Sequence, residues 1–139
     1  MSDLDTLART IWGEARGEGV AGMEAVAACI MNRVRLDLGK DGKPDWWGEG
    51  IEGVCKKPWQ FSCWLPNDPN RDKLLTVSDR DPWFRHAIEI AKRAIAGELP
   101  DPTNAATHYC TFTVAPVTKW AQGREPVAKI GRHHFYRLP

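Results

Sequence analysis

The residue whose position most suggests chemistry is Glu14. Leu7, Ile11 and Glu14 follow the three- and four-residue spacing of one helical face, so a carboxyl group stands where the helix would otherwise present an apolar side chain. Burial beside Ile11 and Trp12 would raise the pKa of this carboxyl group, and a carboxyl group that keeps its proton near neutral pH can act as a general acid. The alternative is that the helix frays at Gly13 and Glu14 points into water.

Glu18 is a candidate second acid. Gly17 and Gly19 make it doubtful that the helix of Glu14 extends this far. Two carboxylates about 5 to 9 Å apart are typical of a two-acid glycosidase, but the sequence does not fix their separation. The other interpretation is that Glu18 caps the start of the next helix or pairs with Arg16.

A second group of candidate residues lies between Lys57 and Trp64. Gln60 and Ser62 offer directional hydrogen bonds among aromatic rings, which suits a polar polymer with apolar faces, such as a sugar chain. The chain has seven tryptophans against two tyrosines and four phenylalanines, and four of the seven lie between residues 37 and 80. These tryptophans either anchor that stretch to the helices or form a platform on which sugar rings stack.

The histidines do not form a recognisable metal site. His133 and His134 are adjacent in a predicted strand and so point to opposite faces, while His108 lies on a neighbouring strand. The sequence has no His-Glu-x-x-His motif, and no local signature marks a nucleophilic cysteine with a histidine partner. We therefore expect no metal and no cofactor.

Length and composition indicate a single soluble domain, residues 1–139. Nineteen Lys and Arg against eighteen Asp and Glu give a formal charge of +1, so no basic field predicts a nucleic-acid partner. The N-terminus lacks the features of a secretory signal, and no apolar run approaches the roughly 20 residues of a membrane span. We expect synthesis in the cytoplasm and a monomer.

The four cysteines are expected to be free thiols. Cys29, Cys55, Cys63 and Cys110 form no Cys-x-x-Cys pair, and a domain of this length does not need a disulfide. The alternative is a local bridge between Cys55 and Cys63, formed after export.

Three helices are predicted to position these residues. The first runs from Asp3, as N-cap, to about Arg16, with glycines following it. The second carries the apolar face Met23 to Val34, with Asn32, Arg33 and Arg35 at other positions. The third has Asp81 as N-cap and Pro82 at its first position, and ends at Gly97; its predicted buried residues are Phe84, Ala87, Ile88, Ala91, Ala94 and Ile95. Residues 37–80 are predicted to form a long binding or catalytic loop.

The last forty residues predict strands. Residues 106–114 alternate with period two, and residues 127–130 and 133–137 flank Gly131-Arg132, which suits a two-residue type II′ turn. Helices followed by a small antiparallel sheet define an α+β fold.

Four motifs together resemble a known family. They are Ile11-Trp12-Gly13-Glu14-Ala15-Arg16-Gly17-Glu18, Ala25-Val26-Ala27-Ala28 with Asn32-Arg33-Val34, Gln60-Phe61-Ser62, and Ile130-Gly131-Arg132-His133-His134-Phe135-Tyr136. Spanning Leu7 to Tyr136, they closely resemble the cell wall hydrolase family of spore cortex-lytic enzymes.

The resemblance implies a lysozyme-like fold and a lytic transglycosylase that cleaves peptidoglycan between N-acetylmuramic acid and N-acetylglucosamine. The family's catalytic glutamate falls on Glu14. Without a signal peptide or a wall-binding repeat domain, the chain looks like the short, endolysin-like versions of bacteriophages and gene-transfer particles. It would act in the cell wall or periplasm, reached by phage-type export or in a particle.

The mechanism expected is cleavage by a single acid, Glu14, with a peptidoglycan glycan strand as partner. The residues expected to bind the substrate are Gln60, Phe61, Ser62, Tyr109, Trp120 and His133. Two alternatives remain open: a hydrolytic muramidase in which Glu18 or another acid steers a water molecule, and a noncatalytic peptidoglycan-binding module.

Overall fold

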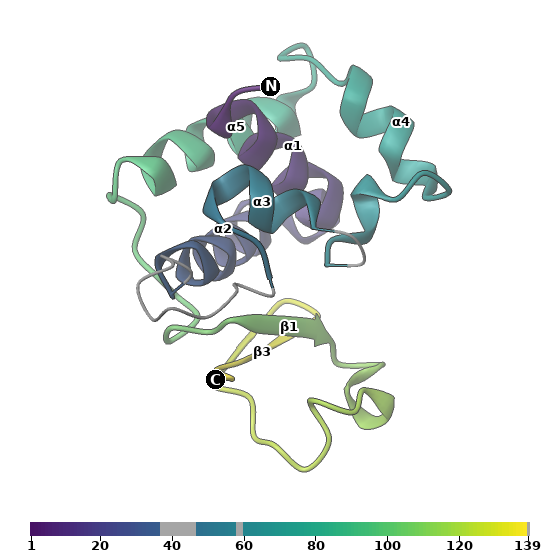
Figure 1. Ribbon diagram of the computed structural model, residues 1–139, viewed down its shortest axis with the longest axis vertical. Coiled ribbons are helices and arrows are strands. Elements are labelled where there is room, and N and C mark those ends of the chain that lie inside the picture. Colours follow the sequence, from purple (N-terminus) through teal and green to yellow (C-terminus); the bar gives the residue numbers. More distant parts are fainter. Residues whose placement is uncertain (37–46, 58–59, 139) are drawn as a thin grey trace.

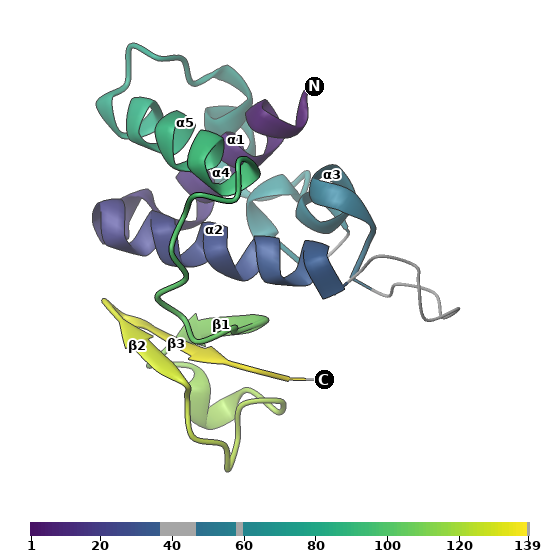
Figure 2. The ribbon, with the colours of Figure 1, turned by 90° about the vertical axis from the view of Figure 1, so that its left-hand side faces the viewer.

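The computed structural model describes residues 1–36, 47–57 and 60–138. Within these ranges, helices occupy one side of the molecule and a three-stranded sheet lies beneath helix α2 (Figure 1 and Figure 2). The α+β class predicted from the sequence is confirmed. No helix in the described ranges is both long enough and apolar enough to cross a membrane.

Helix α1 spans Asp3–Ala15 and buries Leu7 and Ile11. Its N-cap is Ser2, whose hydroxyl oxygen accepts a hydrogen bond from the Asp5 amide at 3.1 Å. The prediction that Asp3 caps this helix is therefore wrong: serine is an equally good cap, and Asp3 contributes its charge in the first turn instead.

A 3₁₀ helix, η1 (Arg16–Glu18), links α1 to α2 (Gly19–Leu36). Helix α2 is the second predicted helix, and Met23, Val26 and Ile30 on its apolar face are fully buried. It lies between the other helices and the sheet, so both sides of it are covered (Figure 2). For this reason Asn32 and Arg33, which were not counted in the apolar face of the predicted helix, are buried as well.

The prediction of one long loop over residues 37–80 is wrong in the part that the structure describes. This part holds α3 (Gly50–Lys56), the 3₁₀ helix η2 (Ser62–Trp64) and α4 (Pro69–Thr76). Helices α3 and α4 have only 7 and 8 residues, too short to show periodicity and dependent on packing against α1 for their stability.

Helix α5 spans Pro82–Ile95, and the Asp81 carboxylate accepts a hydrogen bond from the Phe84 amide at 3.0 Å, as the cap prediction requires. The prediction that Ile95 is buried is wrong, since this last helical residue is 42% exposed. Ile90 takes part in the core instead.

The sheet consists of β1 (His108–Thr111), β2 (Ala128–Ile130) and β3 (His133–Tyr136), in the order β1-β3-β2 with antiparallel pairing. The connection from β1 to β2 contains the 3₁₀ helix η3 (Ala115–Val117). Gly131 has φ +58°, and Arg132 does not have a positive φ, which agrees with the predicted type II′ turn.

All four cysteines are free thiols, as predicted, so Cys55 and Cys63 form no bridge. Burial raises the pKa of both Cys29 and Cys55 to about 12. These thiols are therefore protonated and unreactive at neutral pH.

Candidate active site

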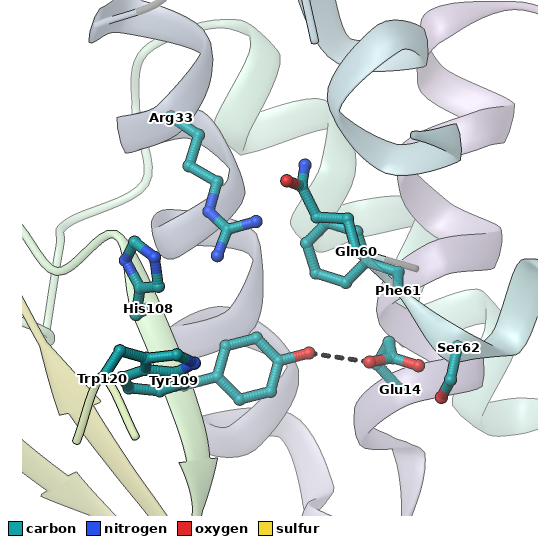
Figure 3. A pocket seen from close by; sticks show the side chains of 8 residues that line it. All are labelled: Glu14, Arg33, Gln60, Phe61, Ser62, His108, Tyr109 and Trp120. Carbon is teal, nitrogen blue, oxygen red and sulfur yellow. Dashed lines mark hydrogen bonds between the residues drawn. The ribbon is translucent and has the colours of Figure 1, made fainter. Parts of the chain in front are cut away.

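A pocket of about 360 Å³ opens where the helices meet the sheet (Figure 3). It draws side chains from α1, α2, the start of η2 and the segment before it, strand β1 and the loop after η3. The lining residues are Glu14, Arg33, Gln60, Phe61, Ser62, His108, Tyr109 and Trp120. The pocket thus gathers Glu14 and five of the six predicted substrate-binding residues.

Glu14 lies in the last turn of α1, which continues through Ala15, so the alternative of a frayed helix is wrong. Its side chain reaches the pocket and accepts two hydrogen bonds. The Tyr109 hydroxyl donates to Oε1 at 2.9 Å, and the Cys63 backbone amide donates to Oε2 at 3.3 Å. Three distant parts of the chain therefore meet at this carboxyl group.

Burial raises the pKa of Glu14 above its ordinary value. The hydrogen bonds from Tyr109 and Cys63 favour the carboxylate and act in the opposite direction, while the charge of Asp68 adds to the increase. The prediction from the sequence was that Ile11 and Trp12 would bury Glu14. Trp12 instead turns toward α5, where its indole N–H donates to the Asp81 carboxylate at 3.3 Å.

Gly13 allows the η2 segment to approach Glu14. A Cβ atom on Gly13 would lie 3.0 Å from the Cβ and 3.1 Å from the Sγ of Cys63. Any larger residue would push Cys63 away, and with it the amide that donates to Glu14. The glycine of the Gly-Glu pair thus has a packing role that the sequence pattern alone does not reveal.

Tyr109 is held by aromatic neighbours on strand β3 and on the loop opposite. Its ring centroid lies 5.1 Å from that of His133, 5.7 Å from Phe135 and 6.4 Å from Phe61. Burial, together with the nearby Glu14 charge, raises the pKa of Tyr109 well above its usual value. Tyr109 therefore keeps its proton and acts as a hydrogen-bond donor.

The Gln60-Phe61-Ser62 segment forms the wall opposite the sheet. The Gln60 amide nitrogen donates to the carbonyl oxygens of Trp47 and Val54, at 2.8 Å each, so its oxygen is the atom left for a ligand. The Phe61 ring is buried, whereas Ser62 is exposed and lies beside Glu14 (Figure 3).

Arg33 was not among the site residues predicted from the sequence. The Arg33 Nε atom donates to the Thr107 carbonyl oxygen, and the neighbouring Asn32 amide donates to Asp101 and to the Ala106 carbonyl oxygen. Together they attach the start of β1 to α2. Arg33 could have been found from its spacing, because Val26, Ile30 and Arg33 continue one helical stripe just as Leu7, Ile11 and Glu14 do.

His108 lines the pocket beside Arg33. Burial and the Arg33 charge lower the pKa of His108 to about 4, so this ring is neutral at physiological pH. From the sequence, His108 was a candidate only for metal binding. In the described part of the chain, no group of three His, Cys, Asp or Glu side chains has a metal-binding arrangement.

The tryptophans play several roles. Trp120 lines the pocket, with its ring 5.0 Å from His108. The Trp64 indole instead donates to Thr10 at 2.9 Å, and Trp83 is exposed on α5. Trp46 and Trp59 lie outside the described residues, so the stacking platform predicted for them stays a prediction.

Two predicted site residues do not line the pocket. His133 is buried with its ring against that of Tyr109, and its Nδ1 atom has no hydrogen-bond partner among the described residues. Glu18 pairs with Arg132 at 3.0 Å and packs against Gly131, so the alternative in which it pairs with Arg16 is wrong. The Arg16 guanidinium instead lies over the Trp12 ring and donates to Asn70.

The fold and the pocket define the class of protein: a lysozyme-like helical domain with a small antiparallel sheet and a buried acid between the two. The family model described as Cell Wall Hydrolase matches residues 17–136. The chain therefore belongs to the cell wall hydrolase family.

Curated relatives include spore cortex-lytic enzymes. That of Halalkalibacterium halodurans is 31% identical over 136 residues, which is 96% of this chain and 34% of the relative. That of Bacillus subtilis is 28% identical over 136 residues, 96% of this chain and 37% of the relative. The chain thus spans a little over a third of the length of these relatives.

Two solved structures share the fold. The catalytic domain of the Bacillus cereus SleB protein is 30% identical with a TM-score of 0.70, over 97% of this chain and 89% of that one. The catalytic domain of the germination-specific lytic transglycosylase SleB from Bacillus anthracis is 31% identical with a TM-score of 0.68. This match covers 97% of the present chain and 93% of the Bacillus anthracis domain. The match therefore corresponds to a catalytic domain.

Proposed function

We propose that this chain cleaves the glycan strands of peptidoglycan between N-acetylmuramic acid and N-acetylglucosamine, by the mechanism of a lytic transglycosylase. The observation that carries the proposal is the environment of Glu14. Among the described residues that line the pocket, Glu14 is the one with a carboxyl group, and burial raises its pKa. The relative from Bacillus anthracis is named a lytic transglycosylase.

In the first step, protonated Glu14 donates its proton to the glycosidic oxygen as the bond from that oxygen to C1 of the muramic acid breaks. Positive charge develops on the ring at C1. Burial favours the protonated state that this step needs, and the Tyr109 and Cys63 donors stabilise the carboxylate that it leaves. The pocket therefore supports both protonation states of one side chain.

In the second step, the Glu14 carboxylate takes the proton from the 6-hydroxyl group of the same sugar, and the 6-oxygen bonds to C1. This closes a 1,6-anhydro ring and returns the proton to Glu14. A hydrolytic reaction with two acids would need a further carboxylate about 5 to 9.5 Å from the first. Glu18 is a poor candidate, since it is paired with Arg132 outside the pocket.

The sugar rings would contact Phe61, Tyr109 and Trp120, and the Gln60 oxygen and Ser62 hydroxyl would supply hydrogen bonds. His133 would act from behind Tyr109 rather than on the glycan directly. The reaction places the working site in the cell wall or periplasm, and we propose that one copy of the chain suffices.

The proposal is tested with purified sacculi and the Glu14→Gln variant, with products identified by mass spectrometry. Wild-type protein should release anhydro-muramic ends, and the variant should be slower by about 10²-fold or more, the usual contribution of a general acid. Glu89→Gln is the matched control, because Glu89 is exposed on α5 and pairs only with Lys92 among the described residues. It should cleave like the wild type.

Three results would contradict the proposal in different ways. Near wild-type activity of Glu14→Gln would remove Glu14 from the mechanism. Reducing muramic ends, each one water heavier than the anhydro form, would identify a hydrolytic muramidase. Binding to sacculi without any cleavage by the wild type would identify a noncatalytic peptidoglycan-binding module.

A further inference from the structure

Arg33 brings a positive charge into the pocket that the proposed reaction does not use. Arg33 is 7% exposed, and its guanidinium lies near two aromatic rings, with its Cζ atom 5.5 Å from the Phe61 centroid and 5.8 Å from that of Trp47. The salt bridges within residues 1–36, 47–57 and 60–138 do not include Arg33. Its charge is therefore not balanced by a carboxylate of the described chain.

The guanidinium of Arg33 is directed into the pocket. Its Nε atom is occupied by the Thr107 carbonyl oxygen at 2.5 Å, which fixes the orientation of the planar group. Figure 3 shows the two terminal nitrogens pointing into the pocket, with Tyr109 and Phe61 between them and Glu14. No hydrogen bond joins these two nitrogens to another described residue.

A buried cation is costly when no carboxylate balances its charge, because burial removes its hydration. A neutral carbonyl group of a ligand would accept a hydrogen bond but leave the charge unbalanced. A carboxylate would balance the charge and match the paired N–H groups of a guanidinium in geometry. His108 cannot supply or oppose this charge, since its low pKa keeps it neutral.

We propose that Arg33 is a specificity-determining residue that binds a carboxylate of the glycan substrate while Glu14 acts at the scissile bond. The inference rests on the proposed function. Peptidoglycan offers this chemistry from two sources: the lactyl carboxylate of a muramic acid that carries no peptide, and the carboxylates of the stem peptide. If the lactyl group is the source, an amidase reaction that removes the stem peptide must supply the substrate.

The test measures binding of soluble glycan oligomers to the Glu14→Gln protein by calorimetry, so that no cleavage interferes. Peptide-free oligomers with lactyl carboxylates are compared with the same oligomers after coupling of the carboxyl groups to methylamine. Peptide-bearing oligomers are compared with their own coupled forms. Coupling should weaken binding about 10- to 100-fold in the pair that contains the recognised carboxylate, the range for hydrogen bonds to charged groups.

The same comparison in an Arg33→Gln background should show no effect of coupling, because the partner of the carboxylate is gone. Arg35→Gln is the control, since Arg35 is exposed on the same helix; it should keep the discrimination. A merely structural role of Arg33 would instead weaken binding of acid and amide forms equally.

Equal affinity of the Glu14→Gln protein for acid and amide forms in both pairs would overturn the proposal, even if Arg33→Gln fails to fold. Unchanged discrimination in folded Arg33→Gln would also overturn it. Cleavage of sacculi by the wild type without carboxylate preference would leave the proposed function standing and reject only the role of Arg33. Absence of binding to every oligomer would reject both.

Discussion

Replacing Gly13 by alanine tests whether close packing of η2 against α1 holds the Glu14 site together. The new Cβ atom would lie 3.0 Å from the Cβ of Cys63, 3.1 Å from its Sγ and 3.2 Å from the Cδ2 atom of Leu74. Both neighbours are fully buried and have little room to move. The η2 segment must therefore shift, together with the Cys63 amide that donates to Glu14.

The magnitude follows from two opposing effects. Overpacking of a tight core site costs about 1 to 3 kcal/mol, whereas alanine in place of glycine within a helix contributes about 1 kcal/mol of stability. We expect Gly13→Ala to lower the free energy of unfolding by up to about 2 kcal/mol. Gly17→Ala is the matched control: nothing lies within 4 Å of its added Cβ atom, so it should be neutral or stabilise by up to about 1 kcal/mol.

Urea denaturation of the wild type and the two variants measures these differences as shifts in the midpoint at constant slope. Release of anhydro-muramic products should also decrease in Gly13→Ala but not in Gly17→Ala, since only the former displaces a donor to Glu14. Equal stability of Gly13→Ala and Gly17→Ala would show that η2 does not pack tightly against Gly13.

Three further predictions concern the acid and its surroundings. Tyr109→Phe removes a hydrogen bond that favours the Glu14 carboxylate, so the pKa of Glu14 should increase. Because the general acid must be protonated, the alkaline limb of the kcat–pH profile should move to higher pH. An alkaline limb at the wild-type pH would contradict the contact between Tyr109 and Glu14. Glu14→Gln should raise the Tm more at about pH 8 than at about pH 4. The reason is that a carboxyl group whose pKa is raised on folding lowers stability as pH rises through that pKa. Equal Tm shifts at both pH values would show that burial does not raise the pKa of Glu14. Glu18→Gln removes the ion pair with Arg132, whose side chain is 70% exposed. The variant should therefore change stability by less than about 1 kcal/mol and leave cleavage intact. A large loss of cleavage would instead support Glu18 as a second acid.

Much of the local structure was predictable because its causes lie within a few residues. The Asp81 cap with Pro82 defined the start of α5, and the glycine of Gly131-Arg132 defined the hairpin between β2 and β3. The short helices α3 and α4 were not predictable in the same way. Each has too few turns to show a period, and its stability comes from contacts with α1.

The same division applies to the site. The apolar stripe of α1 selected Glu14 as a candidate for burial, because one helical face repeats within the local sequence. Only the tertiary structure decided its partners, since the Cys63 and Tyr109 donors lie 49 and 95 residues away in the sequence. Arg33 follows the same rule: its spacing was visible in α2, but its burial depends on the sheet that covers that helix. Periodicity determines which side a residue faces, and packing between distant segments determines what it meets there.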